Sequence, residues 1–408
     1  MPSNPEHKLG IYIHIPFCRS KCDYCDFYSL SGREGDMDAY QKALLTHIRE
    51  TAPLTRHMEV DTIYFGGGTP SYYGAKRLNA ILSLLKKQFR VLKDAEITLE
   101  GNPDSVDARM LTNLRRAGFN RLSLGVQSAC DGQLRCIHRP HTFQQAVDAV
   151  TAARKANIKN LSLDLIYGLP GQDLTSWQQT VEQVLALEPE HLSCYGLKVE
   201  ENTPLWERVS GDEAVPDDDI QADMYLWTVS RLEQAGYLQY EISNFARPSF
   251  QSRHNLRYWL TRPYIGFGPG AHSDFGGRRY SFVRDLDEYI NGVLNGRSII
   301  DSSTLIPERE RGGEYLMLRL RTSQGIEEWE YRRSYFMDFD PIERKLLFYE
   351  RNGWAKQENG RWRLTPEGFL LSNQLIGELL DCQEESSLET LLPRLRQQIQ
   401  HREQKEPL

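Results

Sequence analysis

The stretch CRSKCDYCDF, residues 18–27, holds three of the chain's seven cysteines and follows directly on an apolar, β-rich run. The spacing Cys-x3-Cys-x2-Cys places three thiols in one tight loop. Thiolates are ligands that zinc and iron–sulfur clusters prefer, but a structural zinc site and a closed cluster each take four ligands. The stretch therefore predicts a metal centre with one coordination position left for another molecule.

Zinc and a disulfide are the alternatives for this loop. A zinc site would take its fourth ligand from His14 or Asp23, but His14 is expected to point along a buried strand, and Asp23 lies inside the loop. No second pair of ligands of the zinc-finger kind is evident. We find no signal peptide and no apolar run of about 18 residues, so we expect a cytoplasmic protein with reduced thiols. A [4Fe–4S] cube with one open iron is the favoured hypothesis.

Around the loop, the chain alternates between short β-rich runs and longer helical patterns. The β-rich runs are IYIHIP (11–16), DTIYFG (61–66), AEITLE (95–100), RLSLGV (121–126), NLSLDLIYG (160–168) and HLSCYGLKV (191–199). The helical patterns lie near 36–50, 75–88, 105–117, 143–156, 174–187 and 217–236. Gly118 and Gly236 stand where a helix would stop. This alternation predicts an α/β fold with a parallel sheet covered by helices.

Chemically useful residues lie in or directly after each predicted strand. They are the cysteines, the run 66–70, Glu100 with Asn102, Gln127, Asp164, and Tyr195 with Lys198. Active sites of barrels are assembled from the C-terminal ends of many strands, whereas an open doubly wound sheet places its site at one switch point. We therefore predict a partial (β/α)6 TIM-like barrel.

The strand–helix alternation stops near residue 300. Helical patterns at 307–321 and 341–352, a short strand at 360–365 and a helix at about 366–381 predict a small, mostly helical, winged-helix-like C-terminal domain. We expect the core barrel in 1–240, a region with two further motifs in 241–300, the C-terminal domain in 301–382 and a charged tail in 383–408. The 408 residues carry a net charge of −7 with mixed signs, so no nucleic-acid partner is expected.

The spacing of Cys18, Cys22 and Cys25, with Tyr24 before the last cysteine, closely resembles the signature of the radical S-adenosylmethionine (SAM) superfamily. The stretches YIHIPFC (12–18), FGGGTP (65–70) and LDLIYGLP (163–170) are similar to its lead-in, glycine and fifth-strand motifs. Together they resemble its coproporphyrinogen-dehydrogenase-like (HemN/HemW) branch over nearly the whole chain. The resemblance implies a [4Fe–4S] cluster on the three cysteines, with SAM chelating the fourth iron through its amino and carboxylate groups.

Matching motif positions also imply the residues around SAM. They are Tyr12, Tyr24, Gly67, Gly68, Thr69, Glu100, Gln127, Arg139 and Asp164. The glycines would let the backbone approach the methionine amino group, and the tyrosines would offer an aromatic face and a phenol. The carboxylates, the glutamine and the threonine would make polar contacts, and the planar guanidinium would pair with the SAM carboxylate. A plain surface role for Arg139 is the alternative.

The branch contains a haem chaperone and an oxygen-independent coproporphyrinogen III dehydrogenase. The dehydrogenase motif extends to a fourth cysteine where this chain has Phe27, and that enzyme has a longer region before its cysteines than Cys18 leaves here. Both differences favour the chaperone. The dehydrogenase, or a radical SAM enzyme with another substrate, remains the alternative, so the sequence leaves open whether the chain is an enzyme.

The stretch HNLRYW, residues 254–259, resembles a motif associated with haem binding in the chaperone group. The residues that this resemblance assigns to haem are His254, Asn255, Tyr258 and Trp259. The histidine would be an axial iron ligand, and the aromatic rings would provide flat apolar faces. Arg253 or Arg257 would meet the propionates, and His272 in the stretch 264–273 is a second candidate ligand. A structural role for a histidine beside aromatic residues is the alternative.

The resemblance further implies haem and acceptor haemoproteins as partners, respiratory enzymes among them. It is compatible with a homodimer and with peripheral association with a membrane. The sequence leaves open whether SAM is cleaved, which acceptor receives haem and whether haem is held covalently. The other cysteines, Cys130, Cys136, Cys194 and Cys382, are expected to be small buried hydrophobic residues.

Overall fold

The computed structural model describes residues 7–211 and 213–385, and these form two compact units. The first unit comprises Met1–Gln239, Ser243–Arg257 and Arg262–Leu305, as far as they are described. The second comprises Tyr240–Ile242, Tyr258–Thr261 and Ile306–Leu408, within the same limits. Most of the predicted charged tail, residues 386–408, lies outside the described residues.

Six parallel strands form the centre of the first unit, in the order in which they occur in the chain. They are β1 (Lys8–Ile15), β2 (Glu59–Gly67), β3 (Arg90–Gly101), β4 (Arg121–Gln127), β5 (Asn160–Tyr167) and β6 (His191–Gly196). Each pairs with the next in parallel register. The other edge of β1 pairs with a later strand, and so does that of β6, so the barrel is partial. The predicted fold class is confirmed.

Alternation along these strands separates an apolar outer face from a polar inner face. In β1 the buried Ile11, Ile13 and Ile15 belong to the main core cluster, which also contains leucines of the surrounding helices. The alternate residues of β3 and β5, Glu100 and Asp164 among them, line a cavity instead. Since side chains of a strand point to opposite faces in turn, the same six strands build both the core and the site.

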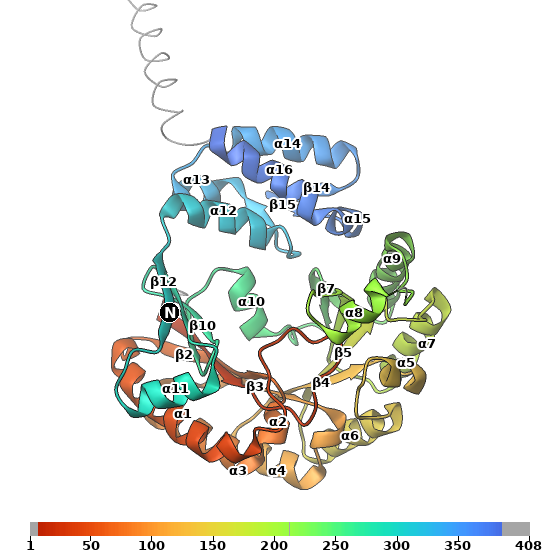
Figure 1. Ribbon diagram of the computed structural model, residues 1–408. Helices are drawn as coiled ribbons and strands as arrows, with labels where there is room; N and C mark the ends of the chain where they lie inside the picture. Colours follow the sequence, from red (N-terminus) through yellow and green to blue (C-terminus); the bar gives the residue numbers. More distant parts are fainter. Residues whose placement is uncertain (1–6, 212, 386–408) are drawn as a thin grey trace, which may run out of the picture. The chain divides into compact units, whose positions relative to one another are not determined.

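The helices cover the outer face of these strands (Figure 1). The long ones are α1 (Met37–Thr51), α3 (Ala75–Gln88), α4 (Ala108–Ala117), α6 (Phe143–Lys155), α7 (Leu174–Leu185) and α9 (Asp218–Gln234). Shorter ones are α2 (Pro70–Tyr73), α5 (Asp131–Cys136) and α8 (Pro204–Ser210). The expected glycine stop of α4 is present, because Gly118 adopts a left-handed φ of 119°. The six predicted helices are all found, with ends shifted by a few residues.

Residues after α9 extend the sheet at both edges, which the sequence did not predict. These elements are β7 (Leu238–Glu241), β8 (Asn244–Ala246), α10 (Arg253–Trp259), β9 (Tyr264–Phe267), β10 (His272–Phe275), β11 (Arg278–Phe282), α11 (Leu286–Leu294) and β12 (Ile300–Leu305). Within the described residues the sheet has 12 strands, in the order β12-β11-β10-β9-β1-β2-β3-β4-β5-β6-β8-β7. The added strands β7–β12 have only three to six residues each, so the periodicity of their sequences gave little signal for a strand.

The second unit combines helices with a small antiparallel sheet, as the winged-helix-like prediction requires. Its elements are α12 (Glu308–Arg319), β13 (Ile326–Glu327), α13 (Glu328–Tyr335), α14 (Asp340–Arg351), β14 (Ala355–Glu358), β15 (Arg361–Leu364), α15 (Pro366–Leu370) and α16 (Ser372–Glu385). The hairpin β14–β15 is joined by β13 in a sheet of order β13-β15-β14. The single helix expected after residue 366 is divided at Leu371 into α15 and α16.

Candidate functional site

The C-terminal ends of the six core strands and the loops after them enclose a cavity of about 430 Å³. Its lining includes the three cysteines and most of the expected SAM residues, namely Tyr24, Gly67, Gly68, Thr69, Glu100, Gln127, Arg139 and Asp164, together with Asn255. Tyr12, His254, Tyr258 and Trp259 are not among the lining residues. The fold thus gathers, on one site, residues that are up to 237 positions apart in the sequence.

The cysteine loop is held in place by contacts on both sides. Backbone hydrogen bonds fix its start, where Cys18 N donates to Leu30 O at 2.9 Å. The Asp23 carboxylate accepts from His138 Nδ1 at 2.6 Å and forms an ion pair with Arg208 of α8. The Asp23 carbonyl accepts from Leu205 N at 3.0 Å. Asp23, one of the two zinc-ligand candidates, is therefore committed to holding the loop.

The chemistry of the three cysteines fits a cluster better than a single ion. Within the described part of the chain, no group of three His, Cys, Asp or Glu side chains is arranged to hold one metal ion. A [4Fe–4S] cube does not need such convergence, because each thiolate binds a different iron. Burial raises the pKa of Cys18 and of Cys25, so both thiols stay protonated until a metal replaces the proton.

The glycine turn after β2 is required by close packing against β1. Gly67 has a φ of 113°, and a Cβ added to it would lie 2.6 Å from the His14 ring. A Cβ on Gly68 would lie 2.8 Å from Phe17 O. The adjacent Thr69 hydroxyl is 3.3 Å from Cys18 Sγ. Local packing alone therefore requires glycine at both positions, whether or not SAM also approaches this backbone.

Glu100 is the first of two carboxylates that face the cavity. Its Oε1 accepts from the Tyr64 hydroxyl at 2.6 Å, and its Oε2 accepts from Gly67 N at 3.2 Å. Burial raises the pKa of Glu100 to about 7, although the Tyr64 hydrogen bond acts to lower it. The group can therefore hold or release a proton near neutral pH.

Asp164 is the second carboxylate, and three serine hydroxyls donate to it. The distances are 2.9 Å from Ser123 Oγ, 3.1 Å from Ser162 Oγ and 2.7 Å from Ser193 Oγ. Sequence reasoning missed these serines. A signal was present, because β4, β5 and β6 each carry a Leu-Ser pair at their second and third residues, which places each serine on the inner face.

Arg139 is already bonded within the protein. Its Nη2 donates to Gly125 O at 2.7 Å and to Asn102 Oδ1 at 2.9 Å, and its Nη1 donates to Cys22 Sγ at 3.3 Å. The guanidinium thus places a positive charge beside a cysteine of the loop. The alternative of a plain surface role does not hold, since the cavity is lined by Arg139. Asn102, which also contacts Thr69, links the third strand to this group.

Gln127 reaches the cavity through an irregular strand end. Its φ is 67°, and the register between β4 and β5 shifts at Gly125 and Gln127. A bulge at the end of a barrel strand redirects the next side chain, and backbone in a rare conformation concentrates at functional sites. The sequence alone gave no indication of this conformation.

The cavity rim combines aromatic and basic side chains. Phe27, where the related dehydrogenase has cysteine, is 71% exposed and lines the cavity together with the half-exposed Tyr195. Lys21 and Lys198 lie on the same rim, and Lys198 forms an ion pair with Glu200 at 2.6 Å. Flat apolar rings beside cations are suited to an aromatic anion.

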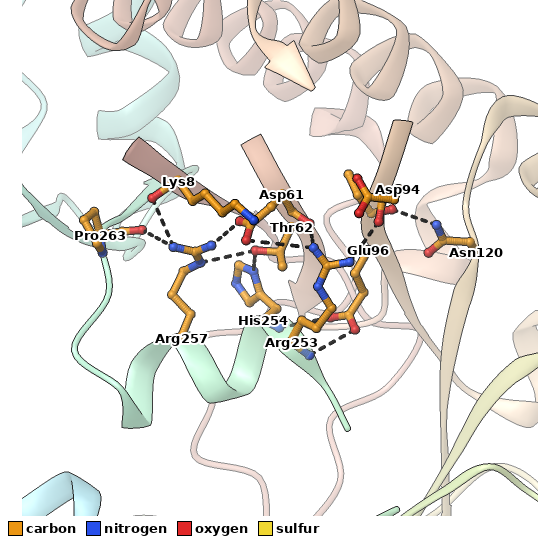
Figure 2. Close-up of polar contacts among 11 residues, drawn as sticks. Lys8, Asp61, Thr62, Asp94, Glu96, Asn120, Arg253, His254, Arg257 and Pro263 are labelled. Atoms are coloured by element: carbon orange, nitrogen blue, oxygen red, sulfur yellow. Dashed lines mark hydrogen bonds and ion pairs between the residues drawn. The ribbon is translucent and has the colours of Figure 1, made fainter. Parts of the chain in front are cut away.

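Two expected residues lie beneath the cavity instead of on its surface. Tyr12 is partly buried, and its hydroxyl lies 3.0 Å from His14 Nδ1. His254 is fully buried on α10, and its Nδ1 lies 2.9 Å from Thr62 Oγ1 (Figure 2). Burial lowers the pKa of His254 well below its usual range, so the ring is neutral. Coordination of iron by His254 would require α10 to leave these contacts.

The remaining expected haem residues are distributed over both units. Tyr258 and Trp259, at the end of α10, belong to the second unit and are half-buried. His272 is exposed at the start of β10 in the first unit. Arg257 is buried in an ion pair with Asp61. The structure therefore does not bring the candidate haem ligands to a common point within either unit.

Comparison with known proteins identifies the family of this chain. The Radical SAM superfamily model matches residues 12–184, and the HemN C-terminal domain model matches residues 306–371. A relative from Bacillus subtilis named "Heme chaperone HemW" is 34% identical over 90% of this chain and 98% of its own length. The chain belongs to the HemW family of the radical SAM superfamily. The cysteine spacing thus predicted the superfamily, and membership implies a [4Fe–4S] cluster and SAM as the cofactors.

Two further relatives and one solved structure extend the comparison. Escherichia coli "Heme chaperone HemW" is 34% identical over 90% of this chain and 97% of its own length. A zebrafish (Danio rerio) protein, "Radical S-adenosyl methionine domain-containing protein 1, mitochondrial", is 35% identical over 80% of this chain and 76% of its own length. The structure of coproporphyrinogen III oxidase (HemN) from Escherichia coli superposes with a TM-score of 0.81 at 24% identity, covering 93% of this chain and 91% of that chain. That match supports the fold.

Proposed function

We propose that this protein is a haem chaperone, which binds haem and transfers it to acceptor haemoproteins. The observation that carries the proposal is the 34% identity to two proteins named Heme chaperone HemW over 90% of the chain. The likeness to coproporphyrinogen III oxidase, at 24% identity, extends to the fold alone. Phe27 adds support, because an exposed ring replaces the fourth cysteine of the dehydrogenase motif at the cavity rim.

The barrel cavity is proposed as the site of the cluster and SAM. Cys18, Cys22 and Cys25 would hold the cluster, and together the bound cluster and SAM supply one-electron chemistry. Thr69 and Arg139 flank the cysteines, and Glu100 would accept a hydrogen bond from SAM when ionised. Asp164 stays oriented by its three serine donors.

We propose that haem is bound by the expected residues His254, Asn255, Tyr258 and Trp259. This binding requires α10 to move. In the described conformation the His254 ring is fully buried. An axial ligand must present a nitrogen to iron, so haem binding through His254 has to displace the ring from Thr62. Asn255 already lines the cavity. The partners would be haem and acceptor haemoproteins, respiratory enzymes included.

We also propose a cytoplasmic location, because thiols reserved for a cluster require a reducing compartment. Among the described residues, no helix combines the length and apolar character needed to cross a membrane. We further propose that the protein can associate with a membrane surface and can form a homodimer.

Haem titration of the cluster-loaded protein tests the function. We expect a Soret shift with saturable binding, followed by transfer of haem to an apo-haemoprotein and recovery of that acceptor's spectrum. Trp259→Ala should weaken binding. Cys130→Ala should not, because Cys130 is exposed and outside the cavity lining. The expectation that the four other cysteines are buried was wrong except for Cys194. Conversion of coproporphyrinogen III with SAM and a reductant, without haem transfer, would replace the chaperone with the dehydrogenase.

A further inference from the structure

Helix α10 is fixed to the strands of the barrel by hydrogen bonds to its backbone and side chains (Figure 2). Both oxygens of the Glu96 carboxylate accept from successive amides of the helix, Arg253 N and His254 N, each at 3.0 Å. The Arg253 guanidinium donates to Asp94 O at 2.8 Å and to Asp61 O at 3.2 Å. Because β2 and β3 supply these acceptors, the start of α10 cannot rotate without breaking several bonds at once.

Arg257 fixes the next turn of the same helix. It is buried, forms an ion pair with Asp61, and donates to Pro263 O at 2.9 Å. Gly10 of β1 leaves room for this side chain, since a Cβ there would lie 2.4 Å from Arg257 Cδ. A buried charge held by a carboxylate and by backbone carbonyls strongly favours one arrangement. Between these two turns, Asn255 lines the cavity, so α10 contributes one residue to its wall.

His254 connects α10 to a cavity carboxylate through one aromatic ring. The imidazole stacks on Tyr64, with ring centroids 5.1 Å apart and an angle of 23° between the planes. The Tyr64 hydroxyl in turn donates to Glu100 Oε1 at 2.6 Å. Tyr12 stacks on the same tyrosine at 6.3 Å. His254 and Tyr12 therefore set the orientation of the Tyr64 ring, and this orientation directs the Tyr64 hydroxyl at Glu100.

We propose that His254 is a positioning residue for the SAM cavity, which acts by holding Tyr64 so that its hydroxyl stays directed at Glu100. This inference rests on the proposed contact between Glu100 and SAM, and it is independent of haem. It gives the HNLRYW stretch a second role, because its histidine supports the cofactor cavity of the barrel while it is not bound to iron.

The charge state of Glu100 provides a readout that packing alone would not change. The groups that face Glu100 are Tyr12, Tyr64, Arg121, Asp164 and the Gly67 amide. Burial raises its pKa, and the hydrogen bond from Tyr64 counteracts this effect by stabilising the carboxylate. If Tyr64 turns away, the pKa of Glu100 rises further. The pH at which SAM affinity reaches half of its high-pH value should then move upward.

The experiment measures the SAM dissociation constant of the cluster-loaded full chain by equilibrium dialysis from pH 5.5 to 8.5. We expect Tyr64→Phe to weaken SAM binding about tenfold at pH 7 and to raise the midpoint. His254→Ala and the bulkier His254→Leu should weaken binding about threefold to tenfold with the same upward shift. His254→Phe keeps an aromatic ring on Tyr64 and should restore affinity and midpoint to near the wild-type values.

A matched control is His47→Ala, which removes another buried histidine, on α1, whose Nδ1 lies 3.0 Å from the Tyr289 hydroxyl. It should leave both quantities unchanged. The inference is overturned if His254→Ala and His254→Leu keep the wild-type midpoint, or if His254→Phe is no better than His254→Ala. If His254→Ala does not fold, the inference is tested by His254→Leu, His254→Phe and Tyr64→Phe. If Glu100→Gln binds SAM like the wild type at every pH, the proposed SAM contact fails as well, whereas haem transfer tests the chaperone role separately.

Discussion

The two ends of the barrel strands use polar residues in opposite ways. At the C-terminal ends, Cys18, Glu100 and Asp164 face a cavity. Towards the N-terminal ends, Asp61 and Glu96 are buried against α10, where their oxygens accept from that helix. All four carboxylates have protein partners, but only Glu100 and Asp164 also line the cavity, where a ligand can reach them. The contrast agrees with the general rule that barrel chemistry lies at the C-terminal face.

The largest effect is expected at the cysteine loop. Cys22→Ala removes the thiol that lies 3.3 Å from Arg139 Nη1, so one iron of the cluster loses its protein ligand. We expect loss of the cluster, measured as iron and sulfide per chain after anaerobic reconstitution. Cys130→Ala should keep the wild-type content. A Cys22→Ala protein with full iron content would remove the loop from the cluster site.

The next effect tests the opposite end of the strands. Asp61→Ala leaves the buried Arg257 without its carboxylate, which should lower the free energy of unfolding by about 3–5 kcal/mol. Asp38→Ala breaks an ion pair with Arg77 on the surface, where the Asp38 side chain is 87% exposed, and should cost no more than about 1 kcal/mol. Urea denaturation of the apoprotein measures both. Equal losses would mean that α10 is not fixed by this ion pair.

The pH dependence of stability should reveal Glu100. Its folded-state pKa of about 7 lies above the ~4.3 of an unfolded chain. Between these values the folded state binds the proton more tightly, so the Glu100 contribution destabilises the fold progressively as pH rises from about 4 to 7. Allowing for solvent in the cavity, we expect a fall of ~2 kcal/mol. The difference in the free energy of unfolding between wild type and Glu100→Gln, measured across this pH range, isolates the Glu100 contribution. Parallel pH profiles of the two proteins would contradict a raised pKa for Glu100.

The smallest effect is expected at the rim. Phe27→Cys restores the residue of the dehydrogenase motif at a side chain that is 71% exposed. Exposed positions contribute little to folding, so the free energy of unfolding should change by no more than ~0.5 kcal/mol. Iron per chain should also stay unchanged, since three cysteines already fill the loop positions. A gain of coproporphyrinogen III conversion in this variant would show that position 27 separates the two functions.

Much of the fold could be predicted because its signals are local. The Cys-x3-Cys-x2-Cys loop, the six β-rich runs and the helix stop at Gly118 each depend on a few neighbouring residues. The strands β7–β12 escaped prediction, because they are short, and because β8 and β9 pair with the distant strands β6 and β1. Gln127 likewise reaches the cavity through a backbone bulge that no residue type indicates.

The sequence by itself determined the superfamily and the strand ends that meet at the cavity, because spacing and alternation encode them, and it predicted the three cysteines as the cluster ligands. Only the tertiary structure decided which polar residues face a ligand and which hold the scaffold. Asp61 and Glu100 are both acidic strand residues, yet one is buried against Arg257 and the other faces the cavity. His254 shows the same limit, because its role depends on Thr62 and Tyr64, which approach it only after the barrel has folded.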